Sequence, residues 1–475
     1  MPYPWPTTAP SGAHRAAYAD AEVRAYWLDT VPGREQHAPL ESRARAQLCI
    51  VGGGFTGLWA ALYAKEQSPE RDVVVLEATR CGAGASSRNG GFIISTLTHG
   101  LANGLARFPR EMLRLESLAH QNFEDLACDL ERYRIDAELE RVGQITVALE
   151  PHELAGLQTE SELAREYGHR VELLDATAMR SQVSSPTYLG GLWQQSDAGL
   201  VNPARLVDGL RRAADGAGVR IHEHSPVRVL ARNDGRVRVV TEAGILDADG
   251  VLLATSAYPP LVRAIGRYVA PVYDYVLMSE PLTAAQQAAV GWSGRQGIGD
   301  TGNRFHYYRL STDGRILWGG YDAVYRYGGP IGPHLDDHDA TFARLSQHFF
   351  TTFPQLEGLR FSHRWGGGID TCSRFSVFFG RALRGRLAYA LGYTGLGVAA
   401  SRFGARTALD LLDGRRTEAT ELSFVRRRPV PFPPEPLRSA VIQLTRRELA
   451  AADRREGRRG LWLRALDRAG LGFDS

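Results

Sequence analysis

The sequence predicts an α/β fold that opens on a strand–turn–helix–strand unit, and three observations near its start carry this prediction. Residues 48–51 (LCIV) are apolar throughout, as in a buried strand of a parallel sheet. Gly52, Gly54 and Gly57 follow with the spacing G-x-G-x-x-G. A helical stretch, LWAALYAKEQ, then leads to a second apolar run, DVVVLE, which ends at Glu77, 20 residues beyond the last glycine.

This spacing is typical of a turn that holds a diphosphate. The first glycine permits the tight turn, the second lets the backbone approach a pyrophosphate, and the third lets the helix pack on the strand. The helix N-terminus attracts the anion through its free N–H groups and its dipole. Glu77 can accept hydrogen bonds from ribose hydroxyls and would repel a 2′-phosphate, which disfavours NADP. Because the strand, the turn, the helix, the second strand and the acid follow one another at the expected spacing, they predict a dinucleotide site rather than glycines that only turn a loop.

The composition is that of an ordinary globular protein. At roughly 150 residues per domain, 475 residues predict two or three domains, and a net charge of +3 gives no reason to expect nucleic acid as a partner. The four cysteines are scattered without a CxxC pair, so we expect no disulfide framework and no metal site. The first 20 residues lack the apolar centre of an export signal, and no run approaches the ~18 apolar residues that span a membrane. We therefore expect a cytoplasmic protein without a transmembrane segment.

A polar, glycine-rich loop, CGAGASSRNGGFI, follows at residues 81–93. Alone it could hold a pyrophosphate or be an ordinary surface loop. Together with GGGFTGLWAA and VVVLEA, it resembles the D-amino-acid oxidase superfamily of FAD enzymes. The resemblance is closest to the amine-oxidising branch that includes glycine oxidase, sarcosine oxidase and gamma-glutamylputrescine oxidoreductase. Later stretches, among them VNPARLVDGLRRAADGAGVRIHEHSPV, APVYDYVLMSEPL and LAYALGYTGLGVAASRFGARTALDLLDG, extend it over about residues 45–425.

The resemblance implies non-covalent FAD and a set of contacts by position. The matching residues are Gly52, Gly54, Phe55, Thr56 and Gly57 at the diphosphate, Glu77 and Ala78 at the ribose, Val227 at the adenine, Ser86, Ser87, Arg88, Asn89 and Gly90 toward the isoalloxazine, and Gly392, Thr394, Gly395 and Gly397 in a closing loop. Two positions depart from many relatives, which have a glycine in place of Ser87 and a histidine in place of Leu396. Cys372 lies at a different offset from the cysteine that holds a covalent flavin in sarcosine oxidase.

The resemblance also implies a Rossmann-like FAD-binding domain interleaved with an α+β substrate domain built on an antiparallel sheet. We expect the FAD-binding domain at 45–95, 195–260 and 355–425, and the substrate domain at 96–194 and 261–354. Residues 1–44 form an N-terminal extension. The spacing of apolar residues from Met112 to Leu130 predicts a helix, and residues 141–154 predict a strand and a loop. Residues 426–475 predict a proline-rich linker and two amphipathic helices, docked on the body or on another subunit.

The activity implied is oxidation of a C–N bond of a primary or secondary amine, or an amino acid derivative, to an imine. A hydride passes to flavin N5, the imine is hydrolysed, and oxygen or another acceptor reoxidises the flavin. The candidate substrate face is the run His306, Tyr307, Tyr308 and Arg309, in which residues 306 and 308 face one way and residues 307 and 309 the other. These residues could equally be core aromatics and a solvated arginine.

Amino-acid oxidases of this family clamp the substrate carboxylate with an arginine near the position of Gly368–Asp370 here. Arg374 lies near that position but is displaced, and Asp370 could attract a cationic amine. The expected partner is therefore a small-molecule amine whose acid group is remote or absent. The sequence does not decide between a monomer and a homo-oligomer. Two alternatives are a flavin monooxygenase, whose Gly-Asp pair has a weak counterpart in GIGDTGNRF, and a non-catalytic flavin-binding scaffold.

Overall fold

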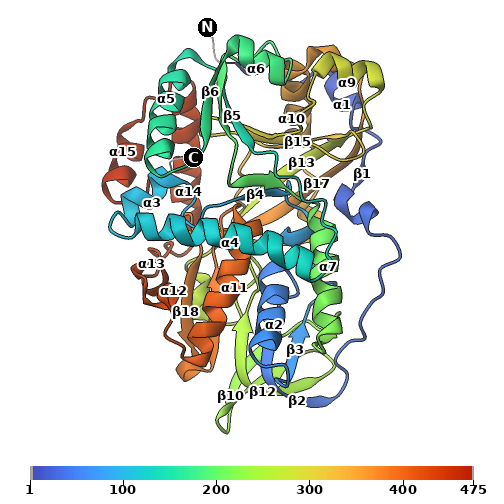
Figure 1. Ribbon diagram of the computed structural model, residues 1–475, viewed down its shortest axis with the longest axis vertical. Helices are drawn as coiled ribbons and strands as arrows, with labels where there is room; N and C mark the ends of the chain where they lie inside the picture. The colour runs from blue at the N-terminus through green and yellow to red at the C-terminus, as the bar shows by residue number, and fades with distance from the viewer. Residues whose placement is uncertain (1–3, 473–475) are drawn as a thin grey trace.

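Two large β-sheets organise residues 4–472, the part of the chain that the computed structural model describes (Figure 1). An eight-stranded sheet lies in the lower half of the view and a nine-stranded sheet in the upper half. A two-stranded sheet, β4 (Phe92–Ile94) with β8 (Ala198–Leu200), is a third and separate unit. The predicted α/β class is confirmed.

The eight-stranded sheet contains the strand that was predicted before the glycine turn. Its members are β10 (Val229–Asn233), β11 (Arg236–Val240), β12 (Ile245–Leu253), β2 (Arg43–Val51), β3 (Val73–Leu76), β9 (Arg220–His222), β19 (Leu387–Leu391) and β18 (Phe378–Ala382). β2 runs parallel to both β12 and β3, so that Cys49 pairs with Val251 on one side and Val74 on the other. All three side chains are completely buried in a cluster with residues of β11, β18 and β19, on the face of the sheet opposite α2.

The nine-stranded sheet is mostly antiparallel. Its members, in spatial order, are β1 (Glu22–Val23), β17 (Phe361–Thr371), β13 (Ala270–Ser279), β16 (Ile316–Gly320), β15 (His306–Leu310), β14 (Gly297–Asp300), β5 (Gln144–Ala148), β7 (Gly190–Gln194) and β6 (Val171–Asp175). β17 pairs with β13 along almost its whole length. By sheet membership, the chain therefore returns to the eight-stranded sheet after Thr371, later than the position near 355 that we expected from the sequence.

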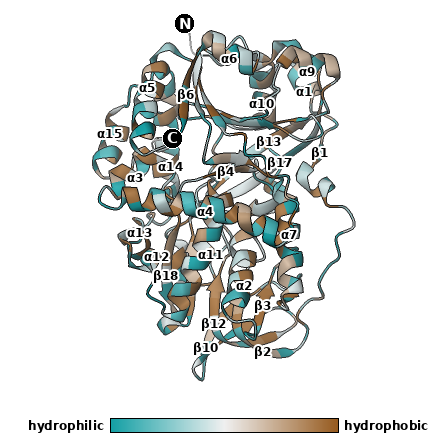
Figure 2. Ribbon diagram, in the orientation of Figure 1, coloured by the Kyte–Doolittle hydropathy of each residue, from teal (hydrophilic) through white to brown (hydrophobic). Residues whose placement is uncertain are grey.

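The helices flank the two sheets. They are α1 (Gly12–Ala16), α2 (Phe55–Gln67), α3 (Leu101–Arg107), α4 (Met112–Arg132), α5 (Pro151–Glu166), α6 (Ala176–Gln182), α7 (Pro203–Gly216), α8 (Arg263–Gly266), α9 (Ala284–Val290), α10 (Asp339–Thr352), α11 (Gly397–Asp413), α12 (Glu418–Glu421), α13 (Ser423–Arg426), α14 (Leu437–Asp453) and α15 (Leu461–Arg468). Residues of α2, α4, α7 and α11 share one apolar core with β2 and β3. Figure 2 shows the apolar strands of that sheet behind helices of mixed polarity.

Local sequence explains why the helix predicted from Met112 to Leu130 is confirmed and why the loop predicted after the strand near residue 148 is wrong. α4 follows the predicted periodicity and buries Met112, Leu115, Phe123, Leu126 and Leu130. The stretch after β5, predicted as a loop, instead begins α5, because Pro151 at the first turn and a reciprocal pair of Glu150 and Glu153 cap its N-terminus. Within residues 4–472, no helix combines the length and apolarity needed to cross a membrane.

The C-terminal helices dock on the body, next to α5 and α3 in Figure 1. The Asp453 carboxylate at the end of α14 accepts hydrogen bonds from the backbone N–H of Asn303 at 3.0 Å and from its side-chain amide at 2.6 Å. On α15, the Trp462 indole donates to the Thr445 hydroxyl at 2.9 Å, which joins the two helices. These contacts position both helices over a cavity described next.

Candidate FAD and substrate site

A cavity of about 1980 Å³ is lined by residues of both large sheets and of the C-terminal helices. Single small-molecule sites usually measure roughly 300–1,000 Å³, so this cavity has room for two ligands side by side. Its walls include the glycine turn after β2, the polar loop after β3, the inner strands of the nine-stranded sheet, and α14. The strand ends that predict a dinucleotide site and the substrate sheet therefore face one space.

The glycines of the turn are required by close approach. Gly52 has φ +110°, and a Cβ built on it would lie 2.4 Å from the Ala254 carbonyl oxygen. A Cβ on Gly57 would lie 1.8 Å from the Gly52 oxygen, which is the helix-on-strand contact expected of the third glycine. Gly54 is the N-cap of α2 and provides no side-chain cap. The helix N-terminus therefore meets the cavity with backbone N–H groups suited to an anion.

Glu77 lines the cavity at the end of β3, as an acid that binds a ribose should. Its Oε2 accepts the Gly53 N–H at 2.8 Å, and its Oε1 accepts the Thr79 N–H at 2.9 Å. Burial raises the pKa of Glu77, and these backbone bonds oppose the shift. Oε1 also accepts the Thr79 hydroxyl at 3.4 Å, whereas Oε2 keeps a second lone pair, to which a ribose hydroxyl can donate.

Most of the residues expected at FAD reach this cavity. Those that line it are Gly52, Gly54, Phe55, Thr56, Glu77, Ala78, Ser86, Arg88, Asn89, Gly90, Val227, Thr394, Gly395 and Gly397. Gly57, Ser87 and Gly392 lie behind the lining instead. Gly392 has φ +82°, a left-handed conformation that favours glycine, so this residue shapes the loop rather than contacting a ligand.

Side chains of the polar loop hold the loop itself. The Arg88 guanidinium pairs with Asp336 and donates to the Gly366 carbonyl at 3.0 Å, which ties the loop to β17. The Asn89 amide donates to the carbonyls of Ala85 and Ser86 at 3.0 Å. This loop therefore offers mainly backbone groups to a ligand.

Asp370 holds the closing loop. Its carboxylate accepts the Gly392 N–H at 2.7 Å, with further backbone bonds from Tyr393 and Thr394. Burial raises the pKa of Asp370 to about 6. These bonds fix the loop that leads to α11. The Asp370 carboxylate therefore binds backbone N–H groups of this loop, rather than the cationic amine that the sequence suggested as its partner.

Of the four residues in the candidate substrate face, only Tyr307 lines the cavity. His306 hydrogen-bonds to Asp300 at 2.8 Å and His348 at 3.0 Å on the opposite side of the strand. Tyr308 shares a hydrogen bond with Tyr188 at 2.8 Å in the core. Arg309 is buried and donates to the Val201 carbonyl at 2.6 Å. Because neighbouring side chains of a strand face opposite ways, His306 and Tyr308 point away from the cavity and Tyr307 points into it. Arg309 is on the same side of the strand as Tyr307, but its long side chain turns away from the cavity.

An acid that the sequence reasoning missed accompanies Tyr307. The Tyr307 hydroxyl donates to Asp274 on β13 at 2.5 Å, and both side chains line the cavity. Withdrawal from water raises the pKa of Asp274 to about 6, and the hydrogen bond from Tyr307 opposes the shift. An acid in the apolar run APVYDYVLM was the available signal.

Comparison with known proteins agrees with this geometry. A family model described as FAD dependent oxidoreductase (DAO) matches residues 47–411. The chain belongs to this family. The gamma-glutamylputrescine oxidoreductase of Escherichia coli is 32% identical over 380 residues, which cover 79% of this chain and 85% of that protein. Glycine oxidase from Geobacillus kaustophilus has a TM-score of 0.66 at 20% identity, covering 81% of this chain and 99% of that one. L-proline dehydrogenase from P. horikoshii has a TM-score of 0.64 at 18% identity, covering 79% and 95%.

FAD is thus the cofactor of this oxidoreductase family, and the residues present fit it. The N-terminus of α2, where the Phe55 N–H donates to the Ser86 hydroxyl at 3.0 Å, suits the diphosphate through the helix dipole, and Glu77 suits a ribose. The Gly299–Asp300 pair that weakly favoured a monooxygenase lies on β14 of the nine-stranded sheet, where Asp300 hydrogen-bonds to His306.

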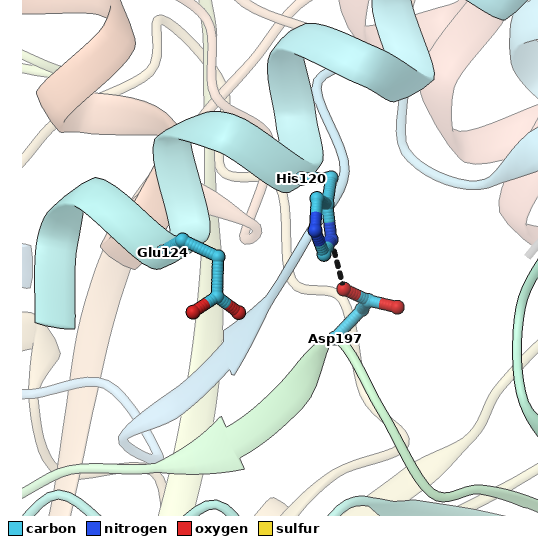
Figure 3. Close-up of side chains that lie close together, drawn as sticks. All are labelled: His120, Glu124 and Asp197. Atoms are coloured by element: carbon cyan, nitrogen blue, oxygen red, sulfur yellow. Dashed lines mark hydrogen bonds and ion pairs between the residues drawn. The ribbon is translucent and has the colours of Figure 1, made fainter.

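Three potential metal ligands gather beside α4, two on the helix and one on the segment before β8 (Figure 3). His120, Glu124 and Asp197 place their ligand atoms within 4.8 Å of one another. Arg141 pairs with Glu124, and Asp197 is 2.6 Å from His120 Nδ1. These contacts account for the charges within the protein, and we assign no metal to the cluster.

Proposed function

We propose that this FAD-dependent oxidoreductase oxidises a C–N bond of a primary or secondary amine to an imine, which water hydrolyses to a carbonyl compound and an amine or ammonia. The observation that carries the proposal is the pair of Asp274 and Tyr307 on the cavity wall. The chemistry that FAD supplies when bound is acceptance of a hydride at N5, with oxygen or another acceptor as the final oxidant.

The pair is suited to an amine. An alkylamine is mostly cationic at neutral pH, and only the neutral form has a lone pair that can assist hydride departure. The Asp274 carboxylate attracts the ammonium group and can take one of its protons. The Tyr307 hydroxyl and the Tyr275 N–H, at 2.5 and 2.8 Å, bind its two oxygens, and the Gly320 N–H is a third donor. A carboxylate has about four lone pairs, so one remains for the ammonium group.

The pair also lies beside the loop expected to run toward the isoalloxazine. A Cβ on Gly90 would lie 2.8 Å from the Tyr307 ring, so ring and loop are in close contact. An amine held at Asp274 would then have its α-carbon near the flavin expected there. We propose Gly90 and its neighbours for that end of FAD, with Glu77, Ala78 and Val227 at the other.

The cavity favours an amine without an adjacent carboxylate. At the position expected for the family's arginine clamp, the lining residues are Gly368, Ile369 and Asp370, none of which is a cation. Arg374 turns away and donates to the carbonyls of Phe424 and Arg427 at 2.9 and 2.8 Å. The name of the Escherichia coli relative, gamma-glutamylputrescine oxidoreductase, supports the same class of substrate.

Anaerobic reduction tests the proposal. The purified protein should have the visible bands of oxidised FAD, and these should bleach with gamma-glutamylputrescine, putrescine or another amine that lacks an α-carboxylate. NADH and NADPH should leave the bands unchanged, and admission of air then reports whether oxygen is an acceptor. Bleaching by NADPH alone would indicate a monooxygenase, and bands unmoved by any amine would indicate a scaffold.

A further inference from the structure

One wall of the substrate part of the cavity comes from outside the family match, which ends at residue 411. The lining residues of α14 include Val441, Ile442, Gln443, Thr445, Arg446 and Leu449. This wall is mainly apolar, with one guanidinium among its partly buried side chains. What Arg446 binds is therefore a property of this chain rather than of the shared fold.

Arg446 is held in place by a neighbour that is itself anchored. The Gln443 amide nitrogen donates to the Tyr325 carbonyl at 3.1 Å, and its oxygen accepts Arg446 Nη1 at 2.9 Å. No carboxylate of residues 4–472 lies within ion-pair distance of Arg446, and its guanidinium donates to no other described residue. The remaining edge of the planar fork is therefore available to a ligand.

The nearby acids are already engaged. Asp322 pairs with Arg344 and accepts the Thr341 hydroxyl at 3.0 Å. Asp453 accepts Asn303 and lies 3.4 Å from Arg304. Arg304 and Arg344 add positive charge around Arg446, and together with burial they lower the pKa of Arg446 despite Asp322. A positive site thus borders the cavity without its own anion.

The diphosphate of FAD is not the anion for this site. The diphosphate would lie at α2 and the loop around Ser86, whereas Arg446 interacts with groups next to β15 and β16 of the other sheet. Val324 pairs with Tyr273, the neighbour of Asp274. The next carbonyl along the chain, that of Tyr325, holds Gln443 beside Arg446. The guanidinium and the proposed amine-binding pair therefore border the same part of the cavity.

We infer that Arg446 binds a carboxylate at the end of the substrate remote from the amine that is oxidised. The inference rests on the proposed function for the identity of the amine end only. A guanidinium fork matches a carboxylate with two parallel hydrogen bonds, which a neutral amide cannot reproduce. The substrate class is thus an amine whose chain ends in an acid group, with apolar residues of α14 along the chain.

Paired ligands test this inference in the holoenzyme. Calorimetry measures the binding of butanoate, hexanoate and octanoate and of their amides, and anaerobic reduction measures the matching ω-amino acids and ω-amino amides. In wild type, one chain length of acid should bind better than its amide. Arg446→Gln should weaken binding of that acid by about tenfold or more and leave the amide within about twofold. Arg454→Gln, an exposed arginine of the same extension, should change neither.

The outcomes separate the two proposals. Equal affinities for every acid and its amide in wild type, or equal losses for both in Arg446→Gln, overturn the role of Arg446. Acid binding that depends on Arg446, without reduction by any amine, preserves the carboxylate site and rejects the amine oxidation. If Arg446→Gln does not fold, Arg446→Lys keeps the charge without the fork and should still lower the preference for the acid.

Discussion

At the scale of single residues, Asp274 has the clearest chemical consequence. It is held by Tyr307 at 2.5 Å, and burial raises its pKa to about 6. If its carboxylate takes a proton from the substrate ammonium, protonation of Asp274 removes the base. We therefore expect the rate of flavin reduction to fall as the pH drops through about 6, and Asp274→Asn to lower the rate at pH 7 by roughly 10²-fold. Stopped-flow reduction at a series of pH values measures both.

A matched variant shows whether the acidic limb belongs to this pair. The Tyr307 hydroxyl lowers the pKa of Asp274, so Tyr307→Phe should raise that pKa and move the limb to higher pH. The aromatic ring stays, so packing against Gly90 is kept. An acidic limb at the wild-type position in both Tyr307→Phe and Asp274→Asn would contradict the assignment.

Gly57 gives a second prediction at this scale. A Cβ there would lie 1.8 Å from the Gly52 backbone oxygen, and neither backbone can move without opening the turn. We expect Gly57→Ala to lower the free energy of unfolding by roughly 1–3 kcal/mol or more and to abolish FAD binding. Urea unfolding and the visible spectrum measure these effects. Gly216→Ala, on an exposed helix position with nothing within 4 Å of its Cβ, should be neutral or stabilising.

At this scale, the sequence predicts a residue's role when the residues that define the role lie close together in the chain. The roles of Gly52, Gly54 and Gly57 follow from a spacing of six residues, and close approach in the structure agrees with it. Asp274 is 33 residues from Tyr307, and only the register of β13, β16 and β15 brings them together. No pattern within one segment indicates such a contact.

At the scale of elements, α5 lines the cavity, and the segment that follows it contacts α4 through His169. In this segment, His169 Nε2 lies 2.9 Å from Glu116 on α4, and its Nδ1 lies 3.6 Å from Asp197. Hydrogen bonds to these two acids raise the pKa of His169 to about 9. The stabilisation this histidine provides is fully present below about pH 6.5 and is lost as the pH rises through about 9.

We therefore expect the wild type to lose stability relative to His169→Gln between pH 6.5 and 9.5. The difference should reach roughly 3 kcal/mol at most, because the shift is shared among several groups. Urea unfolding of both proteins at four pH values measures it. A pH-independent difference between the two proteins would contradict the charged pairing.

Elements also show where sequence patterns fail. The loop predicted after β5 is a helix because its cap, Glu150 with Glu153, is less common than the usual Ser or Thr cap. β17 lies within the range expected for the FAD-binding domain and pairs with β13 of the nine-stranded sheet, a long-range contact that no pattern within one segment indicates. The domain division as a whole stays a prediction.

At the scale of the whole molecule, the cavity is closed by segments that are far apart in sequence. The glycine turn after β2, the nine-stranded sheet and α14 each contribute one wall, and α14 lies outside the family match. The C-terminal helices were predicted from their composition, but that composition did not indicate that they face the cavity. Their contribution depends on two anchors, Asp453 at Asn303 and Gln443 at Tyr325.

Removal of residues 437–475 separates cofactor binding from substrate binding. The glycine turn, Glu77 and the closing loop remain, so the shortened protein should keep FAD and its visible spectrum. The cavity would open to water, so iodide should quench flavin fluorescence more strongly, and amines that carry a remote carboxylate should bind at least about tenfold more weakly. The double variant Asn303→Ala/Gln443→Ala removes the two side-chain anchors but keeps the helices and the N–H of residue 303 that donates to Asp453, so it should show a smaller part of both effects. Loss of FAD on truncation, or unchanged quenching, would mean that the helices cover another part of the molecule in solution.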